Sequence, residues 1–89
     1  MSYTIQFKPA AVRDLRKLPK AVQKRIAAEI DALACNPRPP GIDTLKGEAG
    51  AFYRLRVGDY RVIYQVQDRP LLVLVLRAGH RREVYRLKL

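Results

Sequence analysis

The sequence is poor in the residues that build disulfides, metal centres and cofactor sites. Its 89 residues include one cysteine, Cys35, one histidine, His80, and no tryptophan. One cysteine cannot form an internal disulfide, and one cysteine with one histidine cannot supply the three or four ligands of a zinc site. The five glycines fit neither a P-loop nor a dinucleotide-binding fingerprint. We therefore expect neither a metal ion nor an organic cofactor.

Acidic residues and long apolar runs are also scarce. The eight Asp and Glu residues are scattered singly, unlike the acidic cage of a two-metal nuclease, so we expect any phosphodiester cleavage to proceed without metal. The longest apolar run, residues 71–76, is far shorter than the roughly 20 residues of a membrane span. The first residues lack the apolar segment of a signal peptide. We expect a soluble, cytoplasmic protein with no membrane contact.

Positive charge, in contrast, is abundant. The chain has 18 Lys and Arg residues against 8 Asp and Glu, a formal net charge of +10, and twelve of the 18 are Arg, eight of them at or after Arg54. Because 48% of the residues are apolar, a disordered basic tail is excluded, and we expect one small domain over residues 1–89. Arginine binds phosphate through paired N–H groups. A polyanion is the expected partner; the alternative is a solvated basic surface.

The first half of the chain predicts a strand followed by two helices. Apolar and polar residues alternate over 3–7, which is typical of a half-buried strand, and Pro9 then suits the first turn of a helix that ends before Pro19. A second helix starts at Lys20, with one apolar face formed by Val22, Ile26, Ile30 and Leu33 and a charged outer face that includes Lys20, Lys24 and Arg25. Prolines and glycines over 35–50 predict a loop.

The second half predicts three strands, over residues 53–57, 60–66 and 71–76. Gly58-Asp59 is a two-residue hairpin turn, which fixes the register. We expect the pairs Val57 with Tyr60, Arg56 with Arg61, Leu55 with Val62, and Arg54 with Ile63. The whole pattern predicts an α+β fold: an N-terminal strand and a helical hairpin packed on a small antiparallel sheet (β-α-α-β-β-β), with a short C-terminal element.

This register places Arg54, Arg56 and Arg61 on the sheet face away from the helices. Arg56 opposite Arg61 is a pair of like charges, which is destabilising on the cross-strand scale of roughly 0.2–1 kcal/mol. Either the long side chains extend into water and cover apolar surface with their stems, or the face binds an anion and stabilises charge in a transition state.

The C-terminal segment supplies further candidate residues. Gly79 permits a sharp turn, after which His80, Arg81 and Tyr85 are expected to return beside the arginine face. Val84 and Leu87 are the expected anchors of this segment. The alternatives are an exposed loop histidine for His80 and a packing role for Tyr85.

Three strings in the sequence resemble the RelE toxins of bacterial and archaeal toxin–antitoxin systems: residues 45–47, 53–64 and 79–85. The resemblance covers nearly the whole chain, and the middle string is specific. It implies a toxin that enters the ribosomal A site and cuts mRNA there without metal, the ribose 2′-OH attacking the adjacent phosphate. It also implies a RelB-like antitoxin as partner, and operator DNA bound only through the toxin–antitoxin complex.

The resemblance also assigns roles by motif position. Arg54 and Arg56 stand where well-studied members carry lysines; since arginine keeps its proton at neutral pH, they are interpreted as phosphate clamps. Arg61 and Arg81 are interpreted as stabilisers of the phosphorane-like charge. Tyr85 is the first candidate for the general base by family analogy.

His80 is the second candidate for the base, because a neutral imidazole accepts protons near neutral pH. Lys20, Lys24 and Arg25 are interpreted as general contacts to rRNA or solvent. Two alternative functions remain: a ParE-like DNA gyrase poison, which shares the fold, and a noncatalytic RNA-binding module. The combination of Arg61, Arg81 and Tyr85 favours the ribonuclease.

Overall fold

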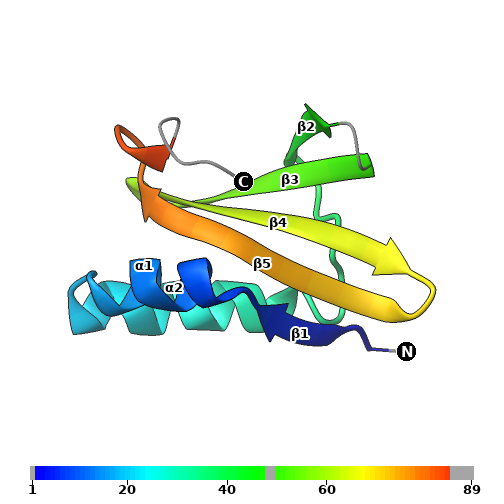
Figure 1. Ribbon diagram of the computed structural model, residues 1–89, viewed down its shortest axis with the longest axis horizontal. Coiled ribbons are helices and arrows are strands. Elements are labelled where there is room, and N and C mark those ends of the chain that lie inside the picture. Colours follow the sequence, from blue (N-terminus) through cyan, green and yellow to red (C-terminus); the bar gives the residue numbers. More distant parts are fainter. Residues whose placement is uncertain (1, 48–49, 85–89) are drawn as a thin grey trace.

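The computed structural model describes residues 2–47 and 50–84, and in it two helices cover one face of a five-stranded sheet (Figure 1). The elements are β1 (Thr4–Phe7), α1 (Pro9–Arg16), α2 (Lys20–Ala32), β2 (Asp43–Gly47), β3 (Gly50–Val57), β4 (Tyr60–Asp68) and β5 (Leu71–His80). The strands lie in the order β1-β5-β4-β3-β2. The predicted α+β class and the order of elements are confirmed.

Two prolines set the bounds of the helices. Pro9 opens α1, where its fixed φ suits the first turn. Pro19 directly precedes α2 and cannot donate the hydrogen bond that would continue α1. Ile26 and Ile30 of α2 are buried in the core between the helices and the sheet. Neither helix of the described residues has the length and apolarity of a membrane span.

The hairpin of β3 and β4 has the predicted register, including Arg56 opposite Arg61 and Arg54 opposite Ile63. Gly58 in its turn has a φ of 59°, a left-handed conformation that favours glycine. The guanidinium of Arg25 fills the space beside this glycine, its nearest nitrogen 3.0 Å from where a Cβ would stand. A side chain at position 58 would therefore meet both backbone strain and Arg25.

Two parts of the sheet differ from the prediction. Residues 35–50 were expected to form a loop, but β2 occupies 43–47, because β3 begins at Gly50 and offers its outer edge as a partner. The sheet is also mixed rather than antiparallel: β1 runs parallel to β5, pairing Thr4 with Leu72 and Phe7 with Val75.

The expectation of a sharp turn at Gly79 is also wrong. Strand β5 continues through Gly79 to His80, and Gly79 pairs with Arg61 of β4. The chain turns only afterwards, where the backbone N–H of Glu83 donates to the carbonyl of His80 at 2.8 Å. β5 extends this far because β4 provides partners for it up to Tyr60.

Apolar residues pack on both faces of the sheet. The larger cluster lies under the helices and includes Tyr53, Leu55, Val57, Val62 and Tyr64, as the register predicted. A smaller cluster joins Ile63, Leu76 and Val84, with Leu45, Phe52 and Leu74 packed against them. Val84 is 2% exposed, so its predicted role as an anchor of the C-terminal segment is confirmed. Leu87 lies outside the described residues.

Candidate active site

Three arginines share the sheet face opposite the helices: Arg54 and Arg56 from β3 and Arg61 from β4. Arg56 lies directly across from Arg61, as predicted. The side chain of Arg56 is 67% exposed, whereas that of Arg54 is only 16% exposed. The three residues form the arginine face, but they present their charge to solvent unequally.

Asp43 of β2 adds a carboxylate to this face. It lies across from Arg54, and its Oδ2 accepts hydrogen bonds from Nε of Arg54 at 3.3 Å and from Nη2 at 3.0 Å. The same oxygen is 3.6 Å from Nη2 of Arg56. The hydrogen bond from Arg54, with the charges of Arg56 and Arg61, lowers the pKa of Asp43 below its ordinary value. Sequence reasoning missed Asp43, because the segment was interpreted as a loop.

The side chain of Arg61 folds over the hairpin turn. Its Nη1 donates to the carbonyls of Gly58 and Tyr60, both at 2.8 Å. Backbone carbonyls therefore fix the guanidinium at the end of the sheet where β3 turns into β4. A guanidinium carries five N–H donors, so two such bonds leave it able to contact a phosphate.

Arg81 lies at the same end of the sheet. Its backbone N–H donates to the carbonyl of Asp59 at 2.7 Å, which ties the turn after β5 to the β3–β4 turn. The residue is exposed. The structure thus brings Arg56, Arg61 and Arg81 to one end of the sheet, although Arg81 is 20 or more positions further along the chain.

His80 lies on the other face. It pairs with Tyr60, and the two rings meet edge to face with centroids 5.6 Å apart. Tyr60 packs against the core under the helices. Because successive strand residues point to opposite faces, Gly79 takes the position across from Arg61 and His80 points away from it. The expected return of His80 beside the arginine face does not occur.

The remaining predicted site residues lie in different parts of the molecule. Lys20 and Lys24 are exposed on α2, on the helical side of the sheet. Arg25, also on α2, reaches the β3–β4 turn beside Gly58. Tyr85, the first candidate for the base, lies outside the described residues.

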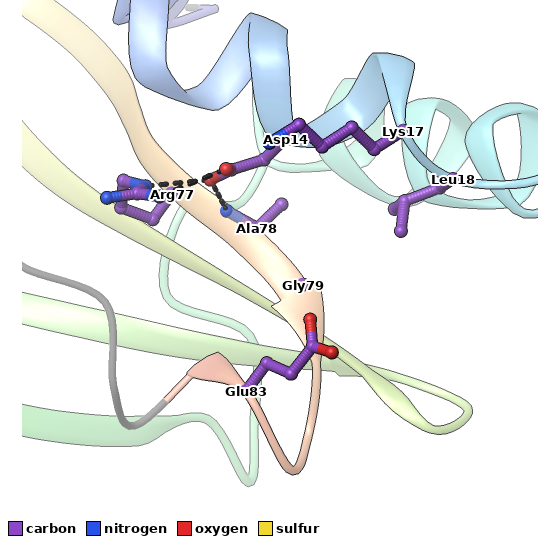
Figure 2. A pocket seen from close by; sticks show the side chains of 7 residues that line it. All are labelled: Asp14, Lys17, Leu18, Arg77, Ala78, Gly79 and Glu83. Atoms are coloured by element: carbon purple, nitrogen blue, oxygen red, sulfur yellow. Dashed lines mark hydrogen bonds and ion pairs between the residues drawn. The ribbon is translucent and has the colours of Figure 1, made fainter.

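A cavity of about 170 Å³ lies between α1 and β5 (Figure 2) and is lined by Asp14, Lys17, Leu18, Arg77, Ala78, Gly79 and Glu83. Asp14 accepts two hydrogen bonds from the guanidinium of Arg77 and one from the backbone N–H of Ala78. These bonds lower the pKa of Asp14 against the opposing effect of its burial, which is the largest single contribution. The cavity therefore borders a fixed structural pair.

Comparison with known proteins identifies the family. A family model described as "ParE toxin of type II toxin-antitoxin system, parDE" matches residues 5–85. The toxin RelG of Mycobacterium tuberculosis is 34% identical over 97% of this chain and 99% of its own length. The chain belongs to the RelE/ParE toxin family. The mRNA interferase toxin RelE of Escherichia coli is 31% identical over 96% of this chain and 92% of its own.

Solved structures agree on the RelE type. The toxin in an archaeal RelE–RelB complex from Pyrococcus horikoshii has a TM-score of 0.80 and 33% identity, covering 91% of this chain and 97% of that one. An isolated Escherichia coli RelE has a TM-score of 0.77 and 28% identity, covering 96% and 93%. This RelE-type toxin therefore carries its arginine face on the fold of its relatives.

Proposed function

We propose that this RelE-type toxin is an endoribonuclease that cuts mRNA in the ribosomal A site, without a metal ion, and so inhibits translation. The observation that carries the proposal is the gathering of Arg56, Arg61 and Arg81 at one end of the sheet. Relatives named mRNA interferases, at 31% identity, support the same activity.

The chemistry follows from these side chains. The ribose 2′-OH gives its proton to a base and its oxygen attacks the adjacent phosphorus; the bond to the 5′-oxygen breaks, and that oxygen takes up a proton. A 2′,3′-cyclic phosphate and a 5′-OH result. Negative charge grows on the phosphate oxygens in the transition state, where fixed guanidinium donors stabilise it. In this proposal Arg56 binds the phosphate, and Arg61 and Arg81 stabilise the growing charge.

The proton acceptor in the proposal is Tyr85, with His80 as the second candidate. Because His80 packs against Tyr60 on the opposite face, it would have to leave that contact to reach the phosphate. Arginine cannot take this role at neutral pH, since it keeps its proton.

The proposed partners are the ribosome with its mRNA and a RelB-like antitoxin, which places the toxin in the cytoplasm. Relatives with the same fold have been solved as RelE–RelB complexes. A net charge of +10 favours an antitoxin with acidic contacts, because complementary charge speeds and directs association. Operator DNA is proposed to be bound only through that complex.

The test is cleavage of mRNA on purified, stalled ribosomes, mapped by primer extension. We expect breaks within the A-site codon and none in the same mRNA without ribosomes. Arg61→Ala and Arg81→Ala should each lower the rate by about 10²–10³-fold, the usual loss for one transition-state donor. Arg16 is an exposed arginine at the end of α1. The Arg16→Ala variant is the matched control and should cleave mRNA at the wild-type rate.

The matching family model is that of a ParE toxin, and the resemblance to ParE toxins implies one competing function, poisoning of DNA gyrase. Incubation of the purified toxin with gyrase and supercoiled DNA separates the two functions. Covalent gyrase–DNA adducts, together with intact mRNA on the ribosome, would refute the ribonuclease. A noncatalytic RNA-binding module would give neither breaks nor adducts.

A further inference from the structure

The arginine face contains its own anion. One carboxylate oxygen, Oδ2 of Asp43, accepts two hydrogen bonds from Arg54 and lies 3.6 Å from the guanidinium of Arg56. Guanidinium groups bind carboxylate and phosphate oxygens alike, through charge-assisted N–H donors. Asp43 therefore stands where part of a nucleic-acid phosphate would otherwise be held.

Exposure divides the two arginines. The side chain of Arg54 is 16% exposed and that of Asp43 is 32% exposed, while Arg56 remains 67% exposed. Arg54 is thus paired with Asp43 and mostly shielded from solvent. Arg56 is the arginine of this pair that is accessible to an incoming phosphate. Asp43 also reduces the formal charge of the face from +3, for Arg54, Arg56 and Arg61, to +2.

We propose that Asp43 is a built-in counter-ion that weakens the binding of free single-stranded RNA, so that the arginine face engages a phosphate only when another surface presents the RNA. It is a specificity-determining residue rather than a catalytic one. The identity of the ligand rests on the proposed function, but the effect on RNA binding does not require cleavage.

The mechanism is competition for Arg56. Neutralising phosphates with cationic side chains releases counterions, so the logarithm of the binding constant falls with the logarithm of salt concentration by about 0.7 per contact for single strands. The ions released are those condensed on the RNA, and an arginine already near an internal carboxylate neutralises a phosphate less completely, so it releases fewer of them and gains less. Removal of the carboxylate should therefore add about one phosphate contact.

The experiment measures binding of a fluorescent 2′-O-methyl RNA of about ten nucleotides, which carries the phosphates but cannot be cleaved by 2′-OH attack. Asp43→Asn keeps an oxygen that can accept from Arg54 and loses the charge. We expect tighter binding than wild type and a salt slope steeper by about 0.7. The increase in RNA affinity of Asp43→Asn over wild type should therefore be about threefold smaller at 200 mM than at 50 mM salt.

Asp68→Asn is the matched control. Asp68 also forms an ion pair with an arginine at 3.0 Å, with Arg38, but at the end of β4 away from Arg61. Both variants change net charge by the same amount. An equal gain from Asp68→Asn would overturn the proposal, because net charge alone would explain it. So would unchanged or weaker binding by Asp43→Asn.

Two further variants keep the test decisive. Asp43→Glu retains the charge and should bind RNA as wild type does, which separates charge from packing. In the Arg56→Ala background, adding Asp43→Asn should not steepen the salt dependence of RNA binding. If Asp43→Asn still increases RNA affinity in that background, competition for Arg56 is refuted. Circular dichroism checks that each variant folds. Failure of ribosomal cleavage by the wild type would refute the proposed function and leave these binding results interpretable.

Discussion

The pair of Asp14 and Arg77 offers a stability test worked directly from the structure. Strand β1 ends at Phe7, and beyond it the edge of β5 is covered by α1. There Asp14 accepts from Nε of Arg77 at 2.7 Å, from Nη2 at 3.0 Å, and from the backbone N–H of Ala78 at 3.1 Å (Figure 2). One carboxylate thus joins a helix to a sheet edge.

Replacing Asp14 by alanine should be costly, because all three bonds are lost within a largely buried site. The side chains of Asp14 and Arg77 are 11% and 21% exposed, and Ala78 is 2% exposed. Removing one partner of a buried charged pair costs about 3–5 kcal/mol. Partial exposure lowers this to about 2–4 kcal/mol, out of a total of roughly 4–13 kcal/mol for a chain of this size. The melting temperature should fall on the order of 10–20 °C.

The cost should also depend on pH. The folded protein holds the pKa of Asp14 below its ordinary value, so on acidification the unfolded chain binds the proton first. The stabilising contribution is then complete above about pH 5 and is lost as the pH falls below about 4 through the lowered pKa. The difference between wild type and Asp14→Ala should shrink over that range.

Urea unfolding followed by circular dichroism, at neutral pH and at several acidic values, measures both effects. Asp68→Ala removes the carboxylate of an exposed pair, 57% exposed on the Asp68 side, and should change stability little. A loss below about 1 kcal/mol for Asp14→Ala, or one that is the same at every pH, would refute the reasoning.

Three other predictions concern single side chains. The hydroxyl of Tyr64 donates to the carbonyl of Pro37 at 2.7 Å in a buried site. Tyr64→Phe should therefore lower the free energy of unfolding, measured with urea, by about 1–2 kcal/mol. Burial raises the pKa of Tyr64 to about 12; the wild type should therefore lose stability between pH 10 and 12, as the unfolded chain ionises first, and the variant should lose less. Val84→Ala removes two methyl groups from the cluster with Ile63 and Leu76 and should cost about 1.5 kcal/mol by the same assay; an unchanged midpoint would mean that Val84 does not anchor the segment. In single-turnover cleavage on the ribosome, Tyr85→Phe should slow the reaction by about 10²–10⁴-fold and His80→Ala only slightly; equal, small losses would mean that neither is the base.

The parts of the fold that sequence predicted are those that local rules determine. A two-residue turn at Gly58 allows one register, and alternation then assigns every side chain of the hairpin to a face. The placement of Arg54, Arg56 and Arg61 together follows from nothing else. The helices could likewise be located from their prolines and apolar spacing.

The parts that it missed depend on distant partners. β2 exists because β3 extends far enough to pair with it, and the composition of 43–47 gives little sign of this. The direction of β1 is set by β5, more than 60 residues away. His80 was misplaced for a related reason: a glycine suggested a turn, but pairing with β4 kept Gly79 in the strand. That shift of one position moves the imidazole to the other face.

Acidic residues form ion pairs with arginines that are distant in the sequence, and such pairs cannot be recognised from the sequence alone. In sequence they are scattered, yet Asp43, Asp68 and Asp14 each hold an arginine, which lies 11, 30 and 63 positions away respectively. The three arginines so held, Arg54, Arg38 and Arg77, have side chains 16%, 41% and 21% exposed, against 67% for Arg56. The net charge read from the sequence therefore overstates what a phosphate meets. Although Arg54 and Arg56 share one strand and one face, removal of Arg56 should weaken RNA binding more than removal of Arg54, because its side chain is the more exposed of the two.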